Sequence, residues 1–176
     1  YAFCVSRVHR VSDPIDVRAV RGKADLAAFV DFPYELYPSA SNWVPPLKMD
    51  IKDQLSVKKN PWFDHAEAEF FLARRAGRVV GRISAHIDHN FNEFQGNDWG
   101  FFGWVECKDD PEAAQALFDT AAEWLKARGR DRMVGPFSYT TNDECGVQFE
   151  GFEIPPPILV PCNHAYDPQL FDNAGM

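Results

Sequence analysis

The sequence predicts one α/β (α+β) domain with a mixed, mostly antiparallel central sheet that is flanked by helices. Three observations predict this fold class. Segments in which apolar and polar residues alternate with a period of two indicate strands, and one long segment has the clean 3.6-residue period of a buried helix. Hydrophobic residues make up 45% of the 176 positions, which is enough for a substantial core in one domain.

The first part of the pattern predicts a leader, one strand and two helices. The leader, residues 1–14, has no clean period, and we treat it as a flexible arm before a domain that covers 15–176. Apolar and charged residues then alternate over 15–20, which predicts a strand. Helical spacing predicts a helix over 23–37 that Pro33 must shorten or kink, and a second helix over 47–57.

Three strands are expected next, arranged as a meander. Residues 69–75 and 78–88 are separated by an Ala-Gly pair, which is typical of a tight hairpin. Residues 90–97 are polar and predict a loop. The third strand, 99–107, is so aromatic that we expect both of its faces to be covered.

The clearest helix of the chain covers residues 111–128. Asp109 or Asp110 can cap its start, and Pro111 suits its first turn. Beyond the helix the sequence is less regular, with a long stretch rich in Gly, Pro and polar residues over 137–157. The other expected elements are a short strand at 132–136, a final strand at 158–162 and a short helix at 168–173.

Charge and cysteine content exclude several classes of function. With 18 basic and 26 acidic side chains the net charge is −8, which disfavours binding to nucleic acids and to anionic membranes. No apolar run reaches the length of a membrane helix, and the start lacks a signal-peptide pattern, so we expect a cytoplasmic protein. The four cysteines lack metal-finger spacing, so we expect reduced thiols and no metal site.

Two acidic features are candidate sites. Glu106 is expected to share a strand face with Phe102 and Trp104, where burial would raise the pKa of its carboxyl group. The second feature is the run Asn142-Asp143-Glu144, in a loop beyond a strand end. Asp143 or Glu144 would act as a base there, with Asn142 orienting a substrate amide, although such residues also form ordinary turns and caps.

Longer segments resemble a known family. The hairpin AEFFLARRAGRVVGRISAHID, the passage GFFGWVECKDDPEAAQALFDTAAEWLKARG and the ending DPQLFDNAGM are similar to the core of the GNAT N-acetyltransferases. The segments NWVPPL, NPWFDHAEAEFFLA, GPFSYTTNDECG and GFEIPPP resemble a bacterial group of GNAT-like proteins, and the match covers about residues 15–176.

The resemblance implies an N-acyltransferase that uses an acyl-CoA, such as acetyl-CoA, to acylate a small amine. It implies that Glu106, Glu144 or Asp143 accepts the amine proton. The implied cofactor-binding residues are Val105, Cys107 and Lys108, and the implied substrate-binding residues are Asn142, Phe102 and Tyr139.

Two positions depart from the family pattern. The glycine-rich loop that holds the CoA pyrophosphate is replaced by residues 106–111, which contain two adjacent aspartates and Pro111. Phe171 stands where many members have a tyrosine that acts as the general acid and protonates the leaving thiolate. Tyr166 is the nearest tyrosine that could take this role. We therefore expect acetyl-CoA to bind weakly or not at all, and a non-catalytic GNAT-fold module for ligand binding or protein interaction is the alternative.

The resemblance also implies a closing hairpin after residue 176. Without that hairpin, the expected strand at 158–162 would expose an unpaired edge. A homodimer, or pairing with leader residues 3–11, would cover that edge.

Overall fold

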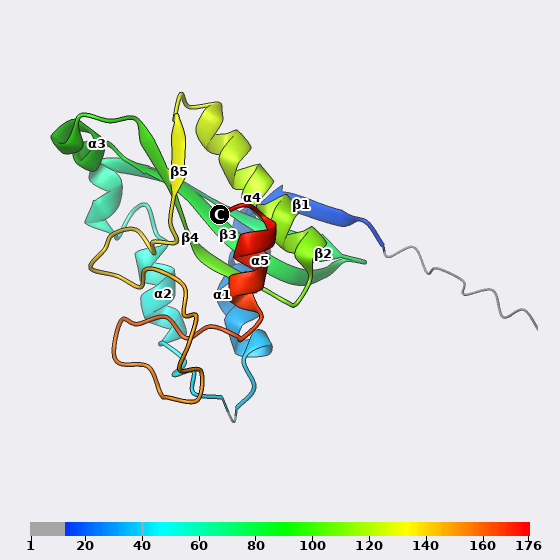
Figure 1. Cartoon of the computed structure of the whole chain (residues 1–176). Helices are drawn as coiled ribbons and strands as arrows, with labels where there is room; N and C mark the ends of the chain where they lie inside the picture. The colour runs from blue at the N-terminus through cyan, green and yellow to red at the C-terminus, as the bar shows by residue number, and fades with distance from the viewer. Residues whose placement is uncertain (1–12, 40) are drawn as a thin grey trace, which may run out of the picture.

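The computed structural model describes residues 13–39 and 41–176, and it contains a five-stranded sheet with its strands in chain order (Figure 1). The first three strand pairs are antiparallel and the fourth, β4 with β5, is parallel. The predicted mixed sheet with flanking helices is confirmed. The strands are β1 (Ile15–Ala19), β2 (Ala66–Arg75), β3 (Arg78–Asp88), β4 (Trp99–Cys107) and β5 (Arg132–Val134).

Helices cover both faces of the sheet. One face packs against α4 and α5, where Phe102 and Ile83 meet Leu117 and Phe118 in one apolar cluster. The opposite face packs against α1, α2 and the 3-10 turn, in a second cluster rich in aromatic side chains. The helices are α1 (Gly22–Leu36), α2 (Lys48–Gln54), the 3-10 turn η1 (Pro61–Asp64), α3 (His89–Gln95), α4 (Pro111–Lys126) and α5 (Asp167–Asn173).

Helix α1 continues through Pro33 to Leu36, so of the two expected effects of this proline, a shorter helix or a kink, the shortening is wrong. A proline at this position has no N–H to donate to the carbonyl four residues earlier. That carbonyl belongs to Phe29, and it accepts a hydrogen bond of 2.8 Å from the buried Arg82 guanidinium instead. The bond lost inside the helix is thus replaced by a bond from the sheet.

A β-bulge interrupts β4 next to Glu106, one of the candidate bases. Between the pairs Ser84↔Gly103 and Arg82↔Glu106, one residue of β3 faces two residues of β4. Trp104 has the left-handed φ of 48° within this bulge. As a result Trp104 lies in the cluster under α1, while Phe102 lies in the cluster under α4. The expectation that Phe102 shares a face with Trp104 and Glu106 is therefore wrong.

Strands β4 and β5 diverge soon after they pair. Their ladder ends at Phe101↔Val134, followed by a last bond of 2.8 Å from the Phe137 N–H to the Phe102 carbonyl. A Cβ atom on Gly103 would lie 1.6 Å from the Phe137 carbonyl oxygen, so this close crossing requires glycine. Beyond Gly103 the segment that follows β5 turns away from the sheet and leaves space beside the second half of β4.

Two further expectations are wrong. The expected polar loop at 90–97 contains helix α3, which the Asp88 side chain caps by accepting from the Phe91 N–H. The expected strand at 158–162 is not formed, because the region from 135 to 166 is irregular and four prolines at 155–157 and 161 remove ladder donors. The edge that this strand would have exposed is therefore not present, and leader residues 3–11 lie outside the described residues.

Candidate functional site

A cavity of about 380 Å³ opens where β4 and the segment after β5 part. It lies mainly on the α1 face of the sheet, and its walls come from elements far apart in sequence: α1, the loop 43–46, α2, β3, β4, the irregular segment 136–163 and Phe171 of α5. Figure 1 shows that segment in yellow to orange, winding beside α2. Most of the lining residues are apolar, and the acidic and basic side chains among them are Arg82, Glu106, Asp143 and Glu144. The site is thus an apolar cavity with a small charged cluster.

Glu106, at the end of β4, is the most perturbed acid of this cluster. Its side chain is only 16% exposed, and burial raises the pKa of its carboxyl group to about 7. The nearby Arg82 and a hydrogen bond from Tyr37 act in the opposite direction, and burial outweighs both. A carboxyl group with this pKa exchanges protons readily near neutral pH, as a general base must.

The hydroxyl of Tyr37, which follows the last residue of α1, orients that carboxyl group. It lies 2.9 Å from Glu106 Oε2 and 2.7 Å from the carbonyl oxygen of Cys162. The hydroxyl has one proton, so it donates either to the carboxylate or to the carbonyl. When Glu106 is protonated, it can donate to Tyr37 while Tyr37 donates to Cys162, so both protonation states have a satisfied arrangement.

Arg82 lies beside Glu106 on the neighbouring strand. Its side chain is buried, Nη2 is 3.8 Å from Glu106 Oε1, and the guanidinium carbon is 4.9 Å from the centre of the Phe29 ring. Burial lowers the pKa of Arg82, and the negative charge of Glu106 opposes that effect. Its Nε atom is buried without a hydrogen-bond partner.

The loop 142–144 contributes to the cavity through two of its residues. Asp143 lines it but is occupied by a turn, since its Oδ2 accepts from both the N–H and the hydroxyl of Thr140. Glu144 lines it with an exposed side chain, and partial burial raises the pKa of its carboxyl group. Asn142 is exposed and does not line the cavity. Since Glu106 is more enclosed than Glu144, Glu106 is the stronger candidate for the base.

The remaining predicted site residues lie in different places. Val105 lines the cavity. Cys107 is buried under α4, where burial raises the pKa of its thiol to about 12, and Lys108 is exposed. Phe102 is in the core on the α4 face, and Tyr139 is buried against Trp62 at a ring distance of 4.2 Å. The structure thus brings Val105 to Glu106 and does not bring the other four there.

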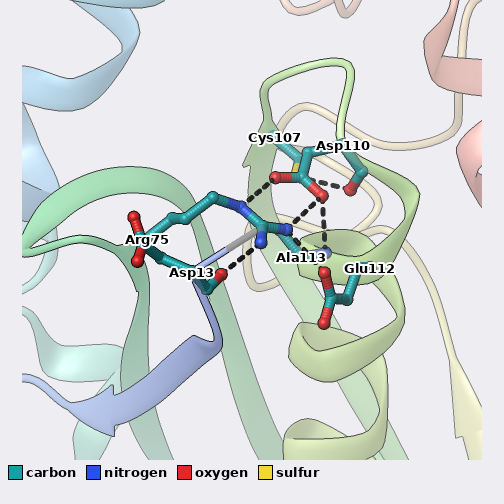
Figure 2. Close-up of polar contacts among 6 residues, drawn as sticks. All are labelled: Asp13, Arg75, Cys107, Asp110, Glu112 and Ala113. Carbon is teal, nitrogen blue, oxygen red and sulfur yellow. Dashed lines mark hydrogen bonds and ion pairs between the residues drawn. The ribbon is translucent and has the colours of Figure 1, made fainter. Parts of the chain in front are cut away.

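Side chains of the protein itself cap the N-terminus of α4 and form ion pairs there, as Figure 2 shows. Asp110 caps the helix by accepting from the Ala113 N–H. Arg75 in turn contacts both carboxylate oxygens of Asp110 at 3.0 Å and Glu112 at 2.8 Å. A pyrophosphate at this helix start would meet these carboxylates instead of free N–H groups. The residues present do not fit the pyrophosphate of CoA at this position.

The two aromatic residues of the last helix region are also occupied. The Tyr166 hydroxyl donates to the Cys107 carbonyl at 3.0 Å, and burial raises its pKa. Phe171 packs against Phe102 and Phe118 on the α4 face. Neither side chain therefore provides a proton donor beside Glu106.

The mouth of the cavity is apolar and open to solvent. Four large apolar side chains line the cavity and remain 45–93% exposed: Val44, Ile158, Leu159 and Val160. Exposed apolar groups that continue a cavity wall are typical of a site for an apolar ligand. Within residues 13–39 and 41–176 there is no group of three or more metal-ligating side chains, and no helix there is long and apolar enough to span a membrane.

Tyr37 and Arg82 are the site residues that sequence reasoning missed. Tyr37 follows the expected helix at its end, and no local pattern links it to a carboxyl group 69 residues away. Two features of the sequence point to Arg82, and the first is that it shares a strand face with other polar residues in a segment whose opposite face is apolar. The proline four residues after Phe29 is the second, because it frees the carbonyl that binds Arg82.

Comparison with known proteins gives two kinds of likeness. The chain is 44% identical over 145 residues to Protein YghO of Escherichia coli (strain K12), covering 82% of this chain and 37% of that protein. It is 44% identical over 147 residues to the bacterial ceramide synthase of Caulobacter vibrioides (strain NA1000 / CB15N), covering 83% and 38%. The chain thus spans less than two fifths of the length of these relatives. No family model matches the sequence.

The likeness among solved structures concerns the fold. A tandem GNAT protein from the clavulanic acid biosynthesis pathway, solved without AcCoA, superimposes with a TM-score of 0.55 at 14% identity. The superposition covers 92% of this chain and 43% of that one. At this level of identity the likeness shows the architecture of the sheet and helices.

Proposed function

Because the chain has the GNAT-like fold, with a buried acid on the wall of an apolar cavity, we propose that it is part of an N-acyltransferase. The proposed acceptor is the amine of a long-chain amino alcohol, and the proposed donor is a fatty acyl thioester. The observation that carries the proposal is Glu106, a mostly buried carboxyl group whose pKa burial raises to about 7.

The chemistry assigned to Glu106 is proton transfer. The neutral amine nitrogen attacks the thioester carbonyl carbon and forms the new C–N bond, while Glu106 accepts the proton that the nitrogen releases. The C–S bond then breaks, and the departing thiolate takes that proton from Glu106, which returns to its carboxylate form. Tyr37 stabilises both forms of Glu106 through its hydroxyl group.

Two observations support a long-chain acceptor in place of a small one. The cavity walls are mostly apolar and continue into an exposed apolar mouth. A ceramide synthase, by its name, forms an amide on a long-chain amino alcohol, and the relative with that name is 44% identical over 83% of this chain.

The proposed donor is an acyl thioester, and the proposal does not require a CoA pyrophosphate to bind at the start of α4. The start of α4 offers Asp110 and Glu112, already paired with Arg75, where the pyrophosphate would lie. The side of the cavity beside Val105, where β4 and β5 diverge, is where the acyl thioester itself would enter. No step in the proposed reaction depends on the nucleotide part of CoA.

The test is amide formation by the purified full-length protein. It would be incubated with a C18 2-amino alcohol and with palmitoyl thioesters of CoA or of pantetheine, and the amide would be measured by mass spectrometry. Glu106→Gln removes the base and is expected to lower kcat by about 100-fold or more. Glu153→Gln, at an exposed carboxylate, is the matched control and is expected to retain full activity.

The dependence on pH separates catalysis from simple binding. Glu106 must be deprotonated to act as a base, so kcat/KM of the wild-type protein should rise with pH through an apparent pKa of about 7. The residual rate of Glu106→Gln should lack the step near pH 7 and keep only the rise that deprotonation of the amine causes. Absence of amide with either thioester, together with tight binding of the amino alcohol, would favour the non-catalytic ligand-binding module.

A further inference from the structure

We propose that Arg82 determines acceptor specificity by donating a hydrogen bond to the hydroxyl oxygen on the carbon next to the acceptor's amine. This inference rests on the proposed N-acyl transfer at Glu106. It adds a residue that recognises the amino alcohol as distinct from a plain amine.

The first support is how firmly Arg82 is held. Pro33 frees the Phe29 carbonyl, which accepts from Arg82 Nη1 at 2.8 Å, and the guanidinium lies over the rings of Phe29 and Trp104 at 4.9 and 5.9 Å. Each of these contacts fixes the plane of the guanidinium group. An arginine held in this way presents its remaining N–H groups in a fixed direction.

The second support is that its hydrogen bonding is incomplete. Nε is buried without a partner, although Arg82 lines the cavity and its side chain is only 7% exposed. Nη2 is 3.8 Å from Glu106 Oε1, which is too long for a hydrogen bond. An oxygen atom of a ligand in the cavity would give Nη2 the hydrogen bond that it does not form with Glu106.

The third support is the side of Glu106 on which Arg82 lies. Strands β3 and β4 stay paired as far as Gly81↔Cys107, so no opening exists between them. The opening lies on the other side of β4, where its ladder with β5 ends at Phe101. The acyl thioester enters from that opening, and Arg82 therefore lies on the acceptor's side of Glu106.

The chemistry of the acceptor matches this pair of groups. An amine nitrogen within reach of Glu106 places a hydroxyl on the adjacent carbon close to the neighbouring guanidinium group. The hydroxyl oxygen accepts from Arg82 because a guanidinium group can only donate. An amine that lacks the hydroxyl leaves Nη2 of Arg82 without an acceptor and is discriminated against.

The experiment compares two acceptors of equal alkyl length, a 2-amino alcohol and the amine without the hydroxyl. The wild-type protein should prefer the amino alcohol in kcat/KM by about 10- to 100-fold, as expected for a hydrogen bond from a charged donor. Arg82→Met removes the donor, and the preference should fall to near one. Arg82→Lys keeps the charge and N–H donors but loses the planar fork that fixes their direction, and it should give an intermediate ratio.

The readout is a ratio within each variant, so it does not depend on how much of that variant is folded. Arg74→Met is the matched control, since Arg74 pairs with Asp25 and does not line the cavity, and it should retain the wild-type ratio. An unchanged ratio in Arg82→Met, or a wild-type protein that uses both acceptors equally, would overturn the role of Arg82 and leave the acyl transfer standing. A wild-type protein that acylates neither acceptor would overturn both proposals.

Discussion

At Glu106, a neighbouring positive charge and burial shift the pKa in opposite directions. Arg82 favours the charged carboxylate, but its closest nitrogen is 3.8 Å away and most of the carboxyl group is removed from water. Burial therefore outweighs the attraction, and the pKa rises to about 7 from the usual 4.5. This result requires the β4 bulge, which directs Glu106 towards Tyr37 and Arg82.

The raised pKa of Glu106 should make the free energy of unfolding depend on pH, and Glu106→Gln should remove this contribution to the dependence. The folded state holds the proton more tightly than the unfolded chain, so its stabilising contribution is complete below pH 4.5 and is lost as the pH rises through 7. Relative to Glu106→Gln, the wild-type protein should lose on the order of 3 kcal/mol between pH 4.5 and pH 8. Urea unfolding at several pH values measures this difference.

Asp167 is a second buried carboxyl group that titrates in the pH range of that experiment. Burial raises the pKa of its carboxyl group to about 6, so it titrates in the same range and contributes to the curves of both proteins, and its charge also raises the pKa of Glu106. Parallel stability curves for the two proteins would mean that the pKa of Glu106 is not raised by burial.

Among single residues, the sequence could identify Glu106 but not its partners. A carboxylate at the end of an aromatic strand is a local signal, and it led to the candidate base. Tyr37 and Arg82 reach the site through long-range packing, in which the end of α1 meets β3 and β4. The spacing between Tyr37 and Glu106 carries no information about their contact, and the signals for Arg82 do not name its neighbour on β4. Phe102 was misplaced because a bulge reverses the alternation of faces.

Regular elements were predictable because each has a period and an end signal. The hairpin of β2 and β3 and the helix α4 follow alternation and capping residues that need no tertiary information. Helix α3 was missed since it is short and polar, and its cap, Asp88, lies at the end of the preceding strand. The region 135–166 has no period, so the far wall of the cavity could not be predicted.

At the start of α4, the two roles of Asp110 can be separated by substitution. Asp110→Ala removes the helix cap and a partner of Arg75, and it should lower the free energy of unfolding by about 1–2 kcal/mol. Asp110→Asn keeps a capping oxygen and should lower it less. Thermal or urea unfolding of both variants gives the comparison.

The same pair of variants tests where the donor binds. The KM for a CoA thioester should be unchanged in Asp110→Asn, since we infer that no pyrophosphate lies at this helix start. A KM that falls for the CoA thioester but not for the pantetheine thioester would place the pyrophosphate there and contradict the inference.

Over the whole molecule, the sheet divides the chain into two apolar clusters with different roles. The cluster under α4 is closed and stabilises the fold, whereas the cluster under α1 adjoins the cavity and its charged pair. The mouth of that cavity belongs to the irregular segment, in which Ile158, Leu159 and Val160 expose apolar surface. Other exposed apolar side chains, such as Phe94, do not line the cavity, so an apolar chain that enters the cavity has its continuous apolar contacts at this mouth.

Alkyl length should therefore control acceptor affinity. Each buried methylene group contributes about 0.8 kcal/mol, so KM should fall about fourfold per methylene until the cavity and its mouth are filled. Leu159→Asp should weaken this dependence for long chains and leave short amines unaffected. Leu159 has a φ of 65°, which aspartate adopts more readily than leucine, so the substitution should not strain the fold. Phe94→Asp, at an equally apolar exposed residue that does not line the cavity, is the control, and an equal KM increase in both variants would contradict binding at the mouth.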